Sequence, residues 1–356
     1  MNRIIYEDCL YIIQNIDKEK LKNKSFLITG ASGMIGSYIA YVLKVLNDKY
    51  NMNIHIILNV RDKNKLREEI LNDKNVEIII QDVVSPFYYE KNIDYIVHAA
   101  SPASPKIMVN HPFEVNIANT IGTYNTLILA KEKKVSGYLF VSSREIYGEP
   151  IDSDYFKEDG MLGYVNPLIP RNGYAEGKKA AENMCVSIKE EYGINTKIVR
   201  LAHTYGPGMS INDGRVQADF LKNVMNNEDI IMKSDGKSIR TYTYVADAIL
   251  AIFKVLLSSN DIVYNVSDDK EISIRELAEV LVSLSNNKSK LIMRIDDSLK
   301  SGSASFTKGV LSNEKIKKEL GWIPKYNVHD GFLRTIEFLK EDGLCNTDAK
   351  IMMKKH

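Results

Sequence analysis

The fold is decided by one glycine-rich stretch, Gly30-Ala31-Ser32-Gly33-Met34-Ile35-Gly36. It follows an apolar run at 25–29, which predicts a buried strand, and it precedes a helical pattern at 37–46. Glycines at this spacing permit a tight turn, let the backbone approach a phosphate and let the helix pack closely on the strand. The helix N-terminus adds N–H groups and a positive dipole end. The stretch therefore predicts a site for the pyrophosphate of a dinucleotide, although such glycines also occur in ordinary turns.

Short apolar strands alternate with helical patterns along the first part of the chain. Further strands are predicted at 54–60, 76–81, 93–98, 137–142 and 196–201, and helices at 4–16, 112–131 and 174–192. This alternation is typical of a parallel sheet covered on both faces. Past Gly206 we expect mostly a smaller lobe, with 242–264 returning to the sheet. Helices are predicted there at 216–225, 245–257 and 273–284, and an irregular polar segment at 288–308.

The composition excludes several classes of protein. The 356 residues carry 47 Lys and Arg against 46 Asp and Glu, a net charge of +1. The chain therefore lacks the excess of basic residues that is typical of a protein that binds nucleic acid. Cys9, Cys185 and Cys345 do not form a disulfide or metal-binding pattern, so we expect reduced thiols in a cytoplasmic protein and no metal. The charges within 1–23 do not suit a signal peptide, and no run approaches the ~18 apolar residues of a membrane helix.

The end of the second predicted strand bears on the choice of cofactor. An acidic residue there would bind the adenosine ribose hydroxyls of NAD. The strand ends instead in Asn59-Val60-Arg61, and an arginine without that carboxylate suits the 2′-phosphate of NADP. Arg61 could equally be a solvated charge, so the residues favour NADP over NAD only slightly. Asp82, which ends the third predicted strand, could bind adenine or cap the next turn.

Tyr174 and Lys178 lie four residues apart at the start of a predicted helix, and therefore on one face of it. A phenol is a poor base at neutral pH because its pKa is about 10. A cation beside it, or a positively charged nicotinamide, favours the phenolate. The pair could then take or return a proton at an alcohol hydroxyl while hydride moves to or from the cofactor. An isolated pair at this spacing is usually a surface pair.

Two serines, Ser142 and Ser143, come at the end of the fifth predicted strand, at the edge where α/β sheets bind ligands. A hydroxyl there could bind the reacting oxygen, or it could satisfy the backbone at the strand end. The glycine turn, the strand-end serine and the Tyr–Lys pair, in this order, are far less common together than any of them alone.

With these three features, the sequence resembles the extended short-chain dehydrogenase/reductase family of nucleotide-sugar epimerases, dehydratases and decarboxylases. The resemblance covers about 24–324 and is greatest to UDP-glucuronate decarboxylases. The further family motifs are His98-Ala99-Ala100, Asn119-Thr120-Ile121-Gly122-Thr123, Tyr205-Gly206-Pro207 and the segments 240–247 and 320–324. The decarboxylase-like segments are 100–105, 166–171, 174–178 and 213–216.

The resemblance implies an α/β architecture with two parts. A Rossmann-type doubly wound parallel sheet, at 24–204 and about 241–265, would bind the dinucleotide. A smaller α+β lobe, at 205–240 and 266–335, would bind the substrate, and 1–23 would be a leading helix. Members of the family commonly form homodimers through two helices, here 112–131 and 174–192, and we expect the same of this chain.

The resemblance also implies a mechanism, in which hydride passes from C4 of a nucleotide-diphosphate sugar to NAD or NADP and a transient 4-keto sugar forms. Tyr174 would be the base, Lys178 would hold the cofactor ribose and tune Tyr174, and Ser143 would polarise the C4 oxygen. Glu145 matches an acidic residue of the dehydratases and decarboxylases. The residues implied in cofactor binding are Gly30, Ser32, Gly33, Met34, Ile35, Gly36, Arg61, Asp82, Val83, Ala99, Ala100, Ser101, Asn119, Tyr174 and Lys178.

Three features depart from the family pattern. Arg144 stands where a small or acidic residue is expected, and it places a cation beside the reacting sugar. His203 replaces an asparagine that touches the substrate pyrophosphate. The arginine that decarboxylases direct to the substrate carboxylate is missing, and Lys308 is the cation nearest to its place. Arg215 and Arg240 are retained as candidate ligands of the substrate diphosphate.

Three hypotheses follow. The first is a nucleotide-sugar enzyme of the decarboxylase, 4,6-dehydratase or epimerase type. The second is an NADPH-dependent reductase of a nucleotide-linked keto sugar or ketose, which Arg61, Arg144 and the missing arginine favour. The third is a nucleotide-sensing or scaffold protein without catalysis, which the intact Ser143, Tyr174 and Lys178 disfavour.

Overall fold

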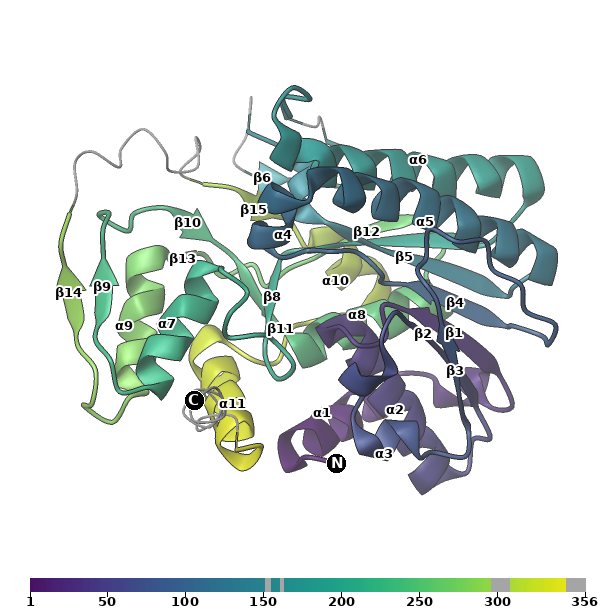
Figure 1. Cartoon of the computed structure of the whole chain (residues 1–356), viewed down its shortest axis with the longest axis horizontal. Helices are drawn as coiled ribbons and strands as arrows, with labels where there is room; N and C mark the ends of the chain where they lie inside the picture. Colours follow the sequence, from purple (N-terminus) through teal and green to yellow (C-terminus); the bar gives the residue numbers. More distant parts are fainter. Residues whose placement is uncertain (151–154, 161–162, 296–307, 344–356) are drawn as a thin grey trace, which may run out of the picture.

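The computed structural model describes residues 1–150, 155–160, 163–295 and 308–343, and every structural statement concerns these residues. A seven-stranded parallel sheet lies at the centre, in the order β12-β7-β5-β4-β1-β2-β3 (Figure 1). Its strands are β1 (Ser25–Thr29), β2 (His55–Val60), β3 (Val76–Ile80), β4 (Tyr95–His98), β5 (Gly137–Ser143), β7 (Thr196–Leu201) and β12 (Val263–Val266). The prediction of a Rossmann-type doubly wound sheet is confirmed.

The strands are mostly apolar because helices cover both faces of the sheet. In β1, Phe26 and Ile28 belong to the core on one face and Leu27 to the core on the other, as the alternation of a strand requires. The first core includes side chains of α1 (Arg3–Gln14), α2 (Met34–Tyr50) and α8 (Val245–Ser258). The second includes side chains of α5 (Pro112–Lys133) and α6 (Gly173–Tyr192).

Four small two-stranded sheets lie outside the central one. They pair β8 (His203–Tyr205) with β11 (Tyr242–Tyr244), β9 (Ile230–Met232) with β14 (Leu291–Met293), β10 (Ile239–Arg240) with β13 (Ile272–Ser273), and β6 (Tyr155–Phe156) with β15 (Val310–Leu311). The remaining helices are α3 (Glu68–Leu71), α4 (Pro105–Asn110), α7 (Val216–Met225), α9 (Ile274–Ser283), α10 (Glu314–Leu320) and α11 (Val328–Glu341). Figure 1 shows α7, α9, β9 and β14 gathered in a lobe beside the sheet.

Two sequence predictions in the second half of the chain need correction. Only the end of the segment 242–264 returns to the central sheet, as part of β12, because β11 pairs with β8 instead. The segment 288–308 is not wholly irregular, since β14 lies within it and pairs with β9, while 296–307 lies outside the described residues. The domain boundaries stay predictions.

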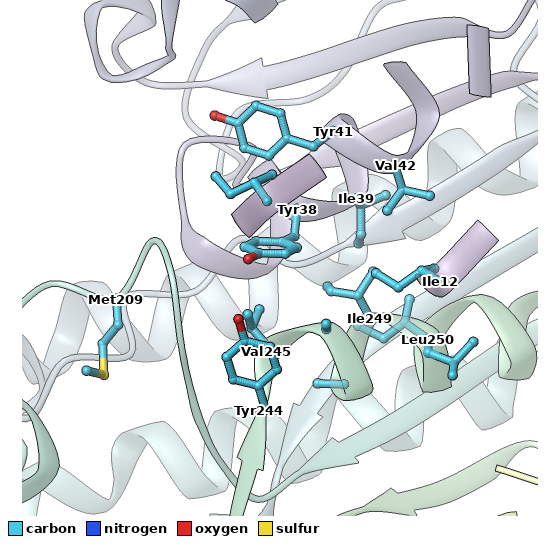
Figure 2. Close-up of a cluster of buried hydrophobic side chains, with 14 of the residues drawn as sticks. Ile12, Tyr38, Ile39, Tyr41, Val42, Met209, Tyr244, Val245, Ile249 and Leu250 are labelled. Carbon is cyan, nitrogen blue, oxygen red and sulfur yellow. The ribbon is translucent and has the colours of Figure 1, made fainter. Parts of the chain in front are cut away.

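The first helix is part of the main core. Figure 2 shows Ile12 of α1 among apolar side chains of α2 and α8. One fully buried carboxylate, Asp8, accepts hydrogen bonds from the hydroxyls of Tyr38 at 3.0 Å and Tyr244 at 2.8 Å. It also accepts one from Nη2 of Arg334 on α11, at 2.7 Å. Asp8 thus joins the first and last described helices to the central core.

The glycine turn lies where the strand order reverses, because β1 pairs with β2 on one side and with β4 on the other. In open α/β sheets, ligands bind at such a point, outside the carboxyl ends of the strands. The residues that follow β1, β2, β3, β4 and β5 therefore face one region, which is the candidate site.

The sequence analysis also made predictions about the cysteines, a metal site and a membrane helix. Cys9 and Cys185 are free and buried, and Cys345 lies outside the described residues. Within the described residues, no group of three or more His, Cys, Asp or Glu side chains could hold a metal ion. A search of the described helices found none with the length and apolar character needed to cross a membrane.

Candidate active site

The turn after β1 is packed so closely that Gly30 and Gly36 leave no room for a side chain. Gly30 has a φ of +66°, and a Cβ atom there would lie 2.7 Å from Cα of Ala100. A Cβ on Gly36 would lie 2.5 Å from the carbonyl oxygen of Gly30. Gly33 is the N-cap of α2, and no side chain caps this helix end. Backbone N–H groups and the helix dipole can therefore approach a phosphate closely.

A cavity of about 340 Å³ adjoins this turn. The residues implied in cofactor binding that line it are Gly30, Ser32, Gly33, Arg61, Asp82, Val83, Ala99, Ala100 and Ser101. Met34, Ile35 and Gly36 lie behind the lining as the first residues of α2. Asn119 also lies behind it, and its Oδ1 accepts a hydrogen bond from the Ser101 hydroxyl at 2.8 Å. A turn with close backbone packing at Gly30 and Gly36 that opens on a cavity of this kind fits a dinucleotide cofactor.

The sequence analysis missed part of this lining. Glu114, Ile117 and Ala118 of α5 line the cavity, as does Pro102. Residues on the face of a long helix carry no local signal for cofactor binding, because only the packing of α5 against the sheet brings them there. The turn that follows β3 is also held from α5, where Nδ2 of Asn125 donates to the carbonyl oxygen of Val83 at 2.9 Å.

One end of the cavity is formed by Asn59, Arg61 and Asp82, and we call it the β2–β3 end. The Asn59 side chain is buried, and its Nδ2 donates to the carbonyl oxygen of Gln81 at 3.0 Å. Asp82 caps the next turn, since its Oδ1 accepts from the backbone N–H of Val84 at 3.1 Å. The Arg61 side chain is 70% exposed, and its Nη1 lies 3.9 Å from Oδ2 of Asp82.

The structure brings the strand-end serine and the Tyr–Lys pair together. Ser143 ends β5 and forms a hydrogen bond with Tyr174, which lies in the first turn of α6. Lys178 is buried one turn further along α6, and its Nζ donates to the carbonyl oxygen of Val141 at 2.7 Å. This Nζ lies 4.5 Å from the ring centroid of Phe140 and 5.8 Å from that of Tyr174.

Burial is the largest influence on the pKa values of Tyr174 and Lys178. It raises the pKa of Tyr174 to about 12, and the charge of Glu145 acts in the same direction. The hydrogen bond from Ser143 and the charges of Arg215 and Arg171 lower that pKa. Burial lowers the pKa of Lys178 to about 7, against the opposing effect of Glu182. The largest cationic effects on Tyr174 thus come from arginines of other elements and not from Lys178.

The Glu145 carboxylate forms a two-point ion pair. Arg171 donates from Nη1 to Oε2 at 2.7 Å and from Nη2 to Oε1 at 2.9 Å. Glu145 lies in the short helix η3 (Arg144–Tyr147), and Arg171 lies in the short helix η4 (Pro170–Asn172), just before α6. The sequence analysis gave Arg171 no separate role, because nothing in the local pattern shows which carboxylate it meets.

The other substrate-binding candidates form a cationic cluster around His203. Nη1 of Arg144 lies 3.5 Å from Nε2 of His203. The pKa of Arg144 is lowered to about 10, chiefly by burial, with the charge of Glu145 opposing the shift and those of Arg240 and Arg171 adding to it. Burial, Arg144, Arg240 and Arg215 all lower the pKa of His203, so the imidazole is neutral at pH 7. A buried cationic region of this kind suits a polyanionic ligand such as a diphosphate.

Two cations near the site already have partners in this structure. Arg215 donates from Nη1 to Oδ2 of Asp213 at 2.6 Å and from Nη2 to the carbonyl oxygen of Ala103. Lys308 lies 3.0 Å from Oε1 of Glu271 and donates to the hydroxyl of Tyr155 at 3.2 Å. In this arrangement Lys308 neutralises Glu271, so the structure offers it no role as a substitute for the missing arginine.

A buried ion pair lies beside the candidate catalytic residues. Nη2 of Arg200, on β7, donates to Oε2 of Glu182, on α6, at 2.7 Å. Oε1 of Glu182 accepts from the hydroxyl of Ser142 at 2.5 Å, and Nη1 of Arg200 donates to the hydroxyl of Tyr147 at 2.7 Å. This network fixes α6, and with it Tyr174, to the carboxyl edge of the sheet. The sequence analysis did not single out either residue of the pair.

Comparisons with known proteins identify the family of the chain. A sequence model described as the NAD dependent epimerase/dehydratase family matches residues 26–267. UDP-glucuronic acid decarboxylase 1 of Xenopus tropicalis is 31% identical over 325 residues, which cover 90% of this chain and 73% of that protein. UDP-glucuronic acid decarboxylase 5 of Arabidopsis thaliana is 30% identical over 311 residues, which cover 87% of each chain.

Solved structures share the fold. A UDP-glucose 4-epimerase of Thermotoga maritima, solved with UDP-glucose, has a TM-score of 0.74 at 22% identity and covers 89% of this chain and 99% of its own. A dTDP-glucose 4,6-dehydratase of Bacillus anthracis, solved with NAD, has a TM-score of 0.71 at 20% identity and covers 90% of this chain and 98% of its own.

The sheet, the glycine turn and the Ser–Tyr–Lys arrangement together define a short-chain dehydrogenase/reductase of the extended type. The chain belongs to the NAD-dependent epimerase/dehydratase family and is an enzyme of the nucleotide-sugar epimerase, dehydratase and decarboxylase type.

Proposed function

We propose that this enzyme oxidises a UDP-linked sugar at C4 to a transient 4-keto sugar, with Tyr174 as the base. One observation carries the proposal. Ser143, Tyr174 and Lys178 meet at the carboxyl edge of the sheet, which is also the edge where the glycine turn opens on its cavity. The choice of uridine rests on the relatives, which are named UDP-glucuronic acid decarboxylases.

Each residue then has a defined task. A nicotinamide cofactor, when bound, would supply a reversible hydride acceptor for C4. Tyr174, as phenolate, removes the proton of the C4 hydroxyl, and Ser143 donates a hydrogen bond to the same oxygen. Lys178 holds the cofactor ribose, and its charge favours the phenolate. Arg215 and Arg240 bind the substrate diphosphate, with Arg144 and His203 beside them.

The 4-ketone stabilises negative charge at C5, which permits loss of the C5 carboxylate as carbon dioxide or, after removal of the C5 proton, loss of water across C5 and C6. Return of the hydride to the opposite face of C4 gives epimerisation instead. These three outcomes are open to the family. Incubation with a panel of UDP-sugars, including UDP-glucose and UDP-glucuronic acid, followed by mass spectrometry, separates them. We expect loss of carbon dioxide or water from one of these sugars, or a change in stereochemistry visible by NMR spectroscopy. No turnover of any UDP-sugar, with NAD or NADP added, would contradict the proposal.

A second candidate function is an NADPH-dependent reductase of a nucleotide-linked keto sugar. It is favoured by the β2–β3 end of the cavity, where buried Asn59 stands in place of a carboxylate and exposed Arg61 can reach a 2′-phosphate. The cofactor released on denaturing the purified protein discriminates between the two. Tightly held NAD supports the first function, whereas an empty site that accepts NADPH supports the second.

We also propose a homodimer in the cytoplasm, formed through α5 and α6. Both helices carry large exposed apolar side chains, among them Ile121 and Tyr124 on α5 and Val186 and Tyr192 on α6. Light scattering is expected to give twice the mass of the chain, and charged substitutions at Ile121 and Val186 are expected to give a monomer. A monomeric wild-type protein would contradict this.

A further inference from the structure

The proposed function gives no task to Glu145 or to its ion-pair partner, Arg171. Arg171 lies three residues before Tyr174, in η4, and it contacts Glu145 of η3 through both guanidinium nitrogens, at 2.7 and 2.9 Å. A planar fork that meets a carboxylate at two points fixes its orientation as well as its charge. The site therefore holds the Glu145 carboxylate in one position relative to Ser143 and Tyr174.

The groups that face Tyr174 come from several elements. From β5, Ser143 forms a hydrogen bond with it, and from η3 comes the negative charge of Glu145. Positive charges come from Arg171 and from Arg215, the N-cap of α7. Its apolar neighbours are Met108 of α4, Val115 of α5 and Ala103. Lys178, one turn along α6, lies 5.8 Å from its ring centroid.

We propose that Arg171 is a positioning residue for the oxidation step: it acts through Glu145, holding this carboxylate in one orientation and offsetting its charge where the Tyr174 phenolate forms. The inference rests on the proposed function. In that step, the proton of the C4 hydroxyl passes to the phenolate oxygen while the hydride leaves C4 for the bound cofactor. A negative charge beside the phenolate opposes its formation, and a cation paired with that charge reduces the opposition.

The sign of the effect follows from the groups around Tyr174. Glu145 raises the pKa of Tyr174, and Arg171 lowers it. Replacing Arg171 by Met leaves the charge of Glu145 unopposed, so the pKa of Tyr174 rises and less phenolate is present at neutral pH. The ion pair is partly solvated, with side-chain exposures of 39% and 23%, so water screens part of the effect. We expect a shift of about one pH unit, which is a tenfold lower rate on the acid side.

The experiment measures the oxidation step directly. Full-length enzyme loaded with NAD is mixed in a stopped-flow instrument with UDP-glucuronic acid or UDP-glucose, and the absorbance of reduced nicotinamide is followed across pH. The variants are Arg171→Met, Arg171→Lys, Glu145→Gln and the double variant Arg171→Met/Glu145→Gln. Arg275→Met is the matched control, because Arg275 also pairs with a glutamate, Glu279, but does so on the exposed face of α9.

The proposal predicts a distinct pattern. The acid limb is the part of the profile of reduction rate against pH where the rate rises with pH. It moves to higher pH in Arg171→Met. In the double variant it moves back toward or below the wild-type position, because both charges are then absent. Arg171→Lys keeps the charge but cannot form the two-point contact, so an intermediate shift is expected. Arg275→Met leaves the limb where it is. Thermal melting of each variant shows whether the fold is retained.

Three results would overturn it. An unmoved acid limb in a folded Arg171→Met enzyme excludes the charge effect. A higher KM for the sugar with an unmoved limb makes Arg171 a substrate ligand instead. An inactive Arg171→Met that Glu145→Gln does not rescue removes the role through Glu145. Absence of any nicotinamide reduction in the wild-type enzyme is a different failure, because it overturns the proposed function and this inference with it.

Discussion

The proposed catalytic centre, with Tyr174 and Lys178, and the β2–β3 end of the cavity differ in how far their ionisable groups are exposed to water. Tyr174 and Lys178 are 7% and 2% exposed, whereas the Arg61 side chain is 70% exposed. Burial shifts both pKa values strongly, raising that of Tyr174 and lowering that of Lys178. Water screens an exposed charge, so the effect of Arg61 on which cofactor binds should be smaller. Substitutions at the catalytic centre should therefore cost far more than substitutions at the β2–β3 end.

The largest effect is expected at the phenol. Tyr174→Phe keeps the ring in its buried position but removes the base, so kcat should fall by about 10³-fold. The dissociation constant of the cofactor should stay within about threefold of wild type, because the glycine turn and its cavity are untouched. Steady-state kinetics and calorimetric titration measure the two quantities. A variant that retained more than about a tenth of the activity would exclude Tyr174 as the base.

The next effect concerns the buried ion pair beside the centre. Arg200→Met leaves the Glu182 carboxylate buried and unopposed, and both side chains of the pair are only 10% exposed. The free energy of unfolding should fall by about 3–5 kcal/mol, measured by urea denaturation. The exposed pair of Arg275 and Glu279 is the control. Arg275→Met should change the free energy of unfolding by less than about 1 kcal/mol. An equal loss of free energy of unfolding in Arg200→Met and Arg275→Met would contradict the claim that burial makes the Arg200–Glu182 pair the more important one.

The third prediction concerns pH. The pKa of Lys178 is lowered from 10.5 to about 7 in the folded protein, so between these values the unfolded chain binds a proton that the folded protein does not. The contribution of Lys178 to the free energy of unfolding therefore increases as pH rises from about 7 toward 10.5. This contribution disappears as pH falls back toward 7. Lys178→Met should lack this part of the rise. Parallel stability curves for the two proteins, measured by urea denaturation at each pH, would show that the lysine is not buried as described.

The smallest effect is expected at the β2–β3 end. Arg61→Gln removes the cation proposed to meet the 2′-phosphate of NADP, so the dissociation constant of NADP should rise about tenfold. That of NAD should not change, because NAD lacks this phosphate. Fluorescence titration with both cofactors measures the ratio. An equal loss of affinity for both, or for neither, would show that Arg61 is only a solvated charge.

Patterns local in the sequence anticipated much of the fold. The apolar strands, the glycine turn and the helix that carries Tyr174 each depend on short-range spacing, and the structure shows them at nearly the expected bounds. The departures occur where pairing partners are distant in sequence. The strand β14 pairs with β9, some sixty residues earlier, and the apolar pattern of three residues is too short to predict it.

The candidate site divides in the same way. Ser143, Tyr174 and Lys178 could be named from motif order, and the structure brings them to one edge of the sheet. The ion pair of Glu145 with Arg171 could not be predicted, because the local sequence around an arginine does not show which carboxylate within its reach it meets. Asn59 was read only as the absence of a carboxylate, whereas its amide proves to be bonded to the end of β3.

The chain's own residue order thus settled the class of fold, the position of the dinucleotide turn and the identity of the phenol and ammonium groups. Each of these follows from backbone geometry or helix periodicity over a few residues. The folded molecule decided which charges act on Tyr174, since Glu145, Arg171 and Arg215 come from three separate elements. It also decided how strongly they act, because burial sets the local dielectric and burial is a property of the packed core rather than of any local segment.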